Sequence, residues 1–136
     1  MMAEFEVYGH ALASLALWPL IQIVLGILSN VGLNADNRCD CGLPKRDYSD
    51  KAYRHSRAFG NAIEMGGPFI AATVAAILAG AAPFWVNLLA SIFIVSRIAT
   101  ATVHIKTENQ VLRSATWAVG MFSVVIMTIM AVRAAF

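Results

Sequence analysis

Several ionisable and amide side chains lie close together in the sequence, just before a long apolar segment. Arg57, Asn61 and Glu64 are spaced i, i+4 and i+7, so a helix places them in a stripe on one face. Arg54 lies one turn earlier, near the same stripe. The residues that follow are almost wholly apolar, and a helix that enters a membrane must turn such a stripe toward other helices or a water-filled cavity. Ionisable groups held there predict a functional site.

A second polar face comes later in the chain, where Arg97, Thr100 and His104 are spaced i, i+3 and i+7. Glu64 lies seven residues inward from Arg57. Arg97 lies seven residues inward from His104, so both charged groups stand about 10 Å below the ends of their helices. An isolated charge at that depth would cost several kcal/mol. The matched depth therefore predicts an ion pair between Glu64 and Arg97.

A third set of polar residues, Arg113 and Ser114, opens the last apolar segment at the same end. The three sets together hold more cations than anions, which suits an anionic ligand whose carboxylates are bound by guanidinium groups. The candidate binding residues are Arg54, Arg57, Asn61, Glu64, Arg97, His104 and Arg113. The alternative is that the arginines are anchors at the membrane interface and that one ion pair is structural.

The composition predicts which elements position these residues. Of 136 residues, 59% are hydrophobic and 13% are charged, whereas a soluble domain carries about 25% charged residues. Four apolar segments have lengths near that needed to cross a ~30 Å hydrocarbon core, at about 8–31, 53–81, 84–104 and 113–132. We therefore expect one all-α domain over residues 1–136, an integral membrane four-helix bundle. The net charge of +2 gives no indication of a nucleic-acid partner.

The connections between the segments predict the orientation of the chain. A polar loop at about 32–53 and a short turn at about 105–112 carry most of the basic residues. The positive-inside rule then places both connections in the cytoplasm and both chain ends on the opposite side. We expect a multi-pass protein of a bacterial inner membrane, in contact with lipid.

Three local patterns add detail to the predicted bundle. Gln22 is a polar group inside the first span and predicts a hydrogen bond between helices. The run Gly66-Gly67-Pro68 predicts a kink or close helix packing in the second span. Ser49 and Asp50 form a pair typical of a helix N-cap just before that span.

Two cysteines, Cys39 and Cys41, lie one residue apart in the polar loop. They are too few for a disulfide framework, and we expect free thiols on the reducing side of the membrane. The alternative is a metal site completed by Asp36, Asp40 and His55, although two thiols at this spacing indicate one weakly.

The motifs in the spans resemble those of the MAPEG family, the membrane-associated proteins of eicosanoid and glutathione metabolism. The similarity extends over nearly the whole chain and is closest to the microsomal prostaglandin E synthase and microsomal glutathione transferase branch. The matching residues are Arg54-x-x-Arg57-Ala58-x-x-Asn61-x-x-Glu64-x-x-x-Pro68 in the second span, Arg97 in the third, and Arg113-Ser114-Ala115-Thr116-Trp117 in the fourth.

This resemblance implies a homotrimer that binds glutathione as cosubstrate in a cleft between neighbouring protomers. It implies a glutathione-dependent transferase or peroxidase that acts on a lipophilic electrophile or hydroperoxide. Arg113 would lie near the glutathione sulfur as a catalytic residue, and Ser114 would donate a hydrogen bond to the thiolate or to a peroxide oxygen. The chain departs from the family pattern at the end of the first span, where Asn30 and Asn34 replace a basic residue. The alternative is a non-catalytic protein of the same fold, with a structural role or another anionic ligand.

Overall fold

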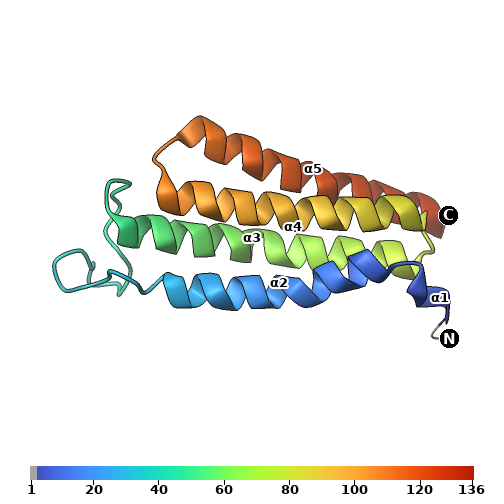
Figure 1. Ribbon diagram of the computed structural model, residues 1–136, viewed down its shortest axis with the longest axis horizontal. Coiled ribbons are helices and arrows are strands. Elements are labelled where there is room, and N and C mark those ends of the chain that lie inside the picture. The colour runs from blue at the N-terminus through green and yellow to red at the C-terminus, as the bar shows by residue number, and fades with distance from the viewer. Residues whose placement is uncertain (1–2) are drawn as a thin grey trace.

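The computed structural model describes residues 3–136, and residues 1 and 2 of the predicted domain lie outside that range. Four long helices run alternately up and down the bundle after one short helical turn (Figure 1). The helices are α1 (Ala3–Glu6), α2 (Gly9–Leu28), α3 (Lys51–Leu78), α4 (Pro83–Lys106) and α5 (Gln110–Ala135). The long α2–α3 loop and the α4–α5 turn lie at one end of the bundle, and both chain ends lie at the other.

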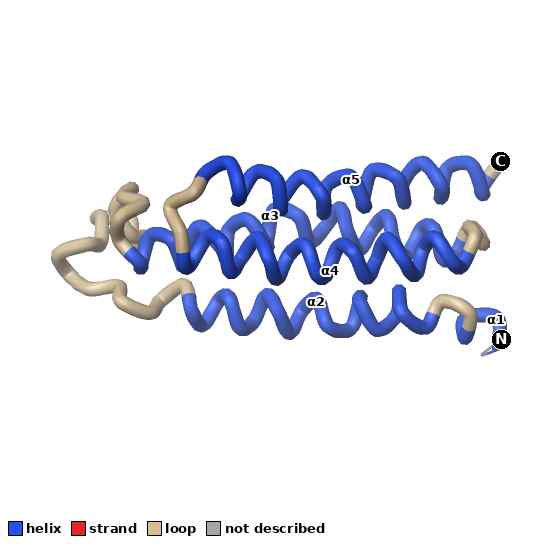
Figure 2. The backbone as a smooth tube through the Cα atoms, turned by 45° about the horizontal axis from the view of Figure 1, so that its top comes forward, coloured by secondary structure: helices blue, strands red, loops and turns tan. Residues whose placement is uncertain are grey.

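The packing order places two helices at the centre. Helices α3 and α4 pack against each other, and each also packs against α2 and α5. Figure 2 shows α2 and α5 on opposite sides of this central pair. Each long helix has the length and apolar character needed to cross a membrane. These features confirm the predicted all-α four-helix bundle and describe a multi-pass integral membrane protein.

Three aromatic rings at the centre of the bundle join α2, α3 and α4. The side chains of Trp18, Phe69 and Phe93 are all 0% exposed. The rings of Phe69 and Phe93 are stacked with centroids 3.9 Å apart, and Trp18 meets Phe93 edge-on at 5.1 Å. Such contacts add about 0.5–1.5 kcal/mol per pair beyond simple burial, so these rings fix the relative rotation of the three helices.

Close approach of α2 and α3 occurs one turn from the aromatic cluster, at Gly66. A Cβ atom added at Gly66 would lie 2.6 Å from Nε2 of Gln22 and 3.0 Å from Nε1 of Trp18. The Gln22 amide donates a hydrogen bond of 3.3 Å to the Ala62 carbonyl, which confirms the predicted interhelical bond. Helix α3 continues through Pro68, and the contacts at Gly66 confirm the close helix packing that was one of the two alternatives predicted for the Gly-Gly-Pro run.

The ends of two helices are capped by side chains in the polar connections. Asp50 precedes α3 and its carboxylate accepts a hydrogen bond from the Ala52 N–H, which confirms the predicted N-cap. Asn109 precedes α5 and accepts from the Leu112 N–H in the same way. Both caps lie at the end of the bundle that carries the polar stripe, and they set where its helices begin.

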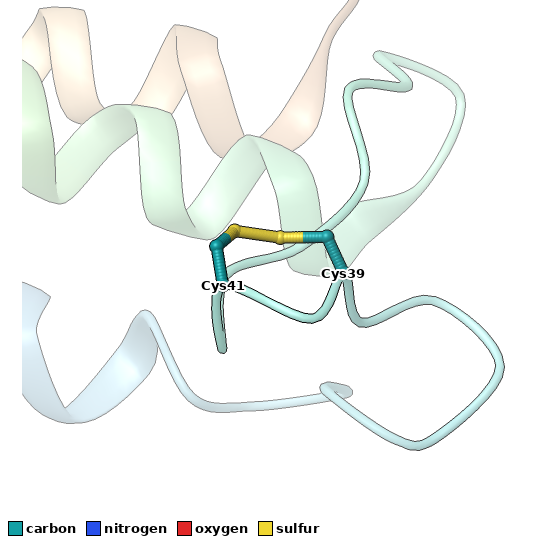
Figure 3. Close-up of a disulfide and its surroundings, with 2 residues drawn as sticks. All are labelled: Cys39 and Cys41. Atoms are coloured by element: carbon teal, nitrogen blue, oxygen red, sulfur yellow. A yellow bond between two sulfur atoms is a disulfide. The ribbon is translucent and has the colours of Figure 1, made fainter.

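The α2–α3 loop pairs the two cysteines, so the prediction of free thiols is wrong. Cys39 and Cys41 form a disulfide, with Cα atoms 5.2 Å apart (Figure 3). The chain reverses at Gly42, whose φ of 83° lies in the region that favours glycine, and the Gly42 N–H donates to the Cys39 carbonyl. This turn brings the two thiols together, a conformation that the spacing of the cysteines alone does not reveal.

The close approach at Gly66 leads to a stability prediction with a matched control on the neighbouring residue. Gly66→Ala should lower the free energy of unfolding by about 1–3 kcal/mol, because the added methyl group displaces Gln22 and Trp18. Gly67→Ala should leave it unchanged or slightly raised, since nothing lies within 4 Å of the added Cβ. Unfolding of the purified protein in detergent measures both. Equal stability of the two variants would contradict the predicted packing.

Candidate functional site

A polar hollow of about 270 Å³ lies at the loop end of the bundle. Three helices and the α2–α3 loop contribute its walls. The lining residues are Tyr48, Asn61, Glu64, His104, Gln110, Arg113, Ser114 and Trp117. Grooves between α2 and α4 and between α4 and α5 are larger, but their linings are nearly all apolar and hold no ionisable side chain. The polar hollow is therefore the better candidate for chemistry.

Five of the eight residues singled out from the sequence line this hollow. They are Asn61, Glu64, His104, Arg113 and Ser114. The helical spacing on α3 and α4 and the position of Arg113 at the start of α5 bring them together, because the three helices present these faces to one another. Arg54, Arg57 and Arg97 do not line it.

Arg97 lies behind the hollow and binds neutral oxygens rather than a carboxylate. Its side chain is 3% exposed, and Nη1 donates to Oδ1 of Asn61 at 2.9 Å. Nη2 donates to the Thr100 hydroxyl at 3.1 Å and to the Trp117 carbonyl at 3.5 Å. The predicted ion pair with Glu64 is wrong: Asn61 occupies the position that faces the guanidinium, and Glu64 is exposed at the rim. The sequence spacing gave the depth of Glu64 and Arg97 in the bundle, but it did not give the direction in which each side chain points.

Arg54 is buried beneath the loop and holds it against the bundle. Its guanidinium donates to the backbone carbonyls of Tyr48 at 2.6 Å, Ser49 at 3.0 Å and Ile105 at 3.2 Å. It also meets Glu108 at 3.5 Å, the single ion pair among the side chains that the structure describes, those of residues 5–136. These contacts tie the loop and the α4–α5 turn to α3. Arg54 thus positions one wall of the hollow without facing it.

Tyr48 forms that wall and is fixed from several directions. Its ring meets Tyr53 edge-on with centroids 5.0 Å apart. Next to it, the Asp47 carboxylate accepts hydrogen bonds from the hydroxyl and the N–H of Ser49. These two bonds lower the pKa of Asp47 below its usual value, so the carboxylate stays ionised and keeps the turn closed.

Arg113 packs on an aromatic ring at the wall of the hollow and has a nitrogen without a hydrogen-bond partner. Its guanidinium carbon lies 4.1 Å from the centre of the Tyr48 ring, a cation–π contact. The Nη1 atom of Arg113 and the Nδ1 atom of His104 are buried and have no hydrogen-bond partner among the described residues. A buried donor left unpaired costs about 1–3 kcal/mol. Arg113 and His104 both line the hollow, so an acceptor group bound there would lie beside these two side chains.

A comparison with models of known protein families finds a match that covers nearly the full chain. The sequence model of the MAPEG family matches residues 7–133, a range that includes the four long helices apart from the last residues of α5. The chain belongs to the MAPEG family. No curated protein and no solved structure matches this MAPEG protein.

Three residues that line the hollow of this MAPEG protein were not candidate site residues from the sequence: Tyr48, Gln110 and Trp117. Trp117 lies four residues after Arg113 on α5, a spacing that places both on one face of the helix. Gln110 lies three residues before Arg113 on α5, so helical spacing could have revealed it. Tyr48 lies in an irregular loop, where no periodicity indicates a direction for the side chain. Its place in the wall depends on the hydrogen bonds of Arg54 to the loop carbonyls.

The contacts of Arg97 predict how it couples to its neighbours on α3. A double-mutant cycle with Arg97→Ala and Asn61→Ala should give a coupling energy of about 1–3 kcal/mol, because the two side chains share a charged hydrogen bond. The matched cycle with Arg97→Ala and Glu64→Ala should give a coupling energy near zero. Unfolding free energies in detergent measure both cycles. A larger coupling to Glu64 than to Asn61 would contradict the observed geometry.

Proposed function

We propose that this MAPEG protein binds glutathione in the polar hollow and transfers it to lipophilic electrophiles, or uses it to reduce lipophilic hydroperoxides. The observation that carries the proposal is the unpaired, buried Nη1 of Arg113 at the wall of the hollow. The motif resemblance to the microsomal prostaglandin E synthase and glutathione transferase branch supports the same assignment.

The charges and hydrogen-bonding groups of the hollow suit the tripeptide. Glutathione carries two carboxylates, which accept from guanidinium and amide groups such as those of Arg113 and Gln110. Its ammonium group needs an acceptor, and the Glu64 carboxylate at the rim is one. Asn61 has its oxygen bound to Arg97, so its amide N–H groups face the ligand as donors.

The chemistry follows from the position of Arg113. A guanidinium beside a thiol favours the anionic form, so it raises the fraction of thiolate at neutral pH. The thiolate then forms a sulfur–carbon bond with an electrophile and displaces its leaving group as an anion. With a hydroperoxide, the thiolate attacks the terminal oxygen, the O–O bond breaks and the alcohol leaves, and a second glutathione converts the resulting sulfenic acid to glutathione disulfide and water. Ser114 follows Arg113 at the rim of the hollow and offers a hydroxyl donor to the sulfur or to the oxygen that leaves.

The lipophilic substrate needs an apolar surface of the bundle to bind. An apolar groove between α4 and α5 opens on the membrane-facing surface, and Thr116 and Val119 belong to its lining. An apolar molecule dissolved in the bilayer can enter this groove without crossing water.

A second protomer would complete the site. Glu64 is exposed at the rim and lies thirteen residues, roughly 20 Å, along α3 from Lys51. A carboxylate exposed to hydrocarbon costs several kcal/mol, so it needs a polar group against it. We therefore propose that neighbouring protomers of a homotrimer close the open side of the hollow and bind the ligand between them.

Binding is tested by the thermal stability of the purified protein across a glutathione titration. A ligand that binds the folded state alone, at 100 times its Kd, should add about 2.7 kcal/mol to the free energy of unfolding. Arg113→Ala should abolish the increase. Arg133→Ala should keep it, because Arg133 lies at the other end of the same helix. No increase in the wild type at millimolar glutathione would refute the proposal and favour the non-catalytic alternative.

The role of Arg113 in activating the thiol is tested by the pH dependence of conjugation. Removing the guanidinium raises the pKa of the bound thiol, so Arg113→Ala should lower kcat/KM at neutral pH by about 10–100-fold. The rate of the variant should recover at alkaline pH, where the thiol ionises without help. Arg133→Ala should follow the wild-type profile. A loss that is the same at every pH would show that Arg113 has another role.

A further inference from the structure

We propose that Cys39 and Cys41 form a redox site that exchanges electrons with small thiols. The site lies in the α2–α3 loop, outside the lining of the polar hollow. It would react with low-molecular-weight thiols and disulfides of the glutathione type. The proposal goes beyond the proposed function and does not depend on it.

The first argument is that this disulfide does little to hold the fold together. A disulfide stabilises a protein more when it closes a longer loop, and here one residue separates the two cysteines. Both cysteines belong to the same loop, so the bond joins no two helices (Figure 3). A bond with so small a structural contribution can open without unfolding the protein.

The second argument is that the loop keeps its conformation through other contacts. The Cys39 N–H donates to the Leu43 carbonyl at 2.9 Å, and Arg38 and Pro44 pair across the loop. The Lys45 N–H donates to the Asn37 carbonyl at 2.7 Å. These backbone hydrogen bonds do not involve the sulfur atoms, so they hold the two cysteines near each other in the reduced state as well. Reduction is therefore readily reversible.

The third argument is access. Cys41 is exposed and Cys39 is half-buried, so an incoming thiolate reaches the Cys41 sulfur first. Attack there forms a mixed disulfide, and Cys39 leaves as a thiolate that takes a proton from water. A second small thiol then attacks the mixed disulfide at the sulfur of the first. In total, two small thiols are oxidised to their disulfide and the cysteine pair gains two electrons and two protons.

The fourth argument is the compartment. The basic residues predict that this loop faces the cytoplasm, where persistent disulfides are rare and those that form are usually catalytic or redox-sensing. A permanent structural bond would conflict with that orientation. A pair that cycles between dithiol and disulfide agrees with it.

The experiment is a redox titration of the full-length protein in detergent, in buffers of varied reduced-to-oxidised glutathione ratio. After acid quenching, free thiols are counted from the gel shift caused by a maleimide-linked polymer. We expect two thiols to appear together as the ratio rises and to disappear together when it is reversed. A pair that stays oxidised in millimolar reduced glutathione, or stays reduced in oxidised glutathione, would overturn the proposal.

Single-cysteine variants test the direction of attack. Cys39→Ser leaves the exposed Cys41, which should gain one glutathionyl group from oxidised glutathione, seen by mass spectrometry of the intact protein. Cys41→Ser leaves the half-buried Cys39, which should react more slowly. The reverse order would overturn the assignment of Cys41 as the attacked sulfur.

Arg113→Ala should keep the wild-type redox midpoint while losing stabilisation by glutathione, which separates this proposal from the proposed function.

Discussion

The guanidinium of Arg97 joins three helices at the depth where the candidate site lies. It extends from α4, donates to Asn61 on α3 and lies against the backbone of α5 at Trp117. Close contact continues at Gly120, where an added Cβ would lie 3.2 Å from the Arg97 Nε. Inside a membrane bundle such a charge must be surrounded by protein, so its partners cannot separate without exposing it. The walls of the hollow are therefore fixed by a side chain that does not line it.

The arginines of the site divide the work between positioning and binding. Arg97 aligns the helices, and Arg54 holds the loop through three backbone carbonyls. These contacts place Tyr48 beneath Arg113, whose guanidinium packs on the ring and keeps one nitrogen unpaired. The excess of cations over carboxylates thus has two causes. Arg54 and Arg97 use their guanidinium groups in hydrogen bonds that hold the fold, and the guanidinium of Arg113 is available to a ligand.

The sequence predicted the helices, one cap and most of the hollow because these follow from periodicity and composition. The spacing of Asn61 and Glu64 placed both on one face, and both line the hollow. The spacing could not decide which of the two meets Arg97, because residues three apart differ by about 60° in direction as well as in height along the helix. The wall formed by Tyr48 and the disulfide of the loop depend on turns and on contacts between distant segments. Those features have no repeating pattern from which to predict them.

Glu64 at the rim also affects which molecules can occupy the hollow. In a bilayer the most abundant competitor for any open groove is a lipid acyl chain. An acyl chain that slid into the hollow would strand the Glu64 carboxylate and the unpaired Arg113 nitrogen in hydrocarbon, at a cost of several kcal/mol. Water or a polar ligand in the hollow avoids this free-energy cost, because neither group is then surrounded by hydrocarbon. The charged groups that line the hollow therefore keep the surrounding lipid out of it.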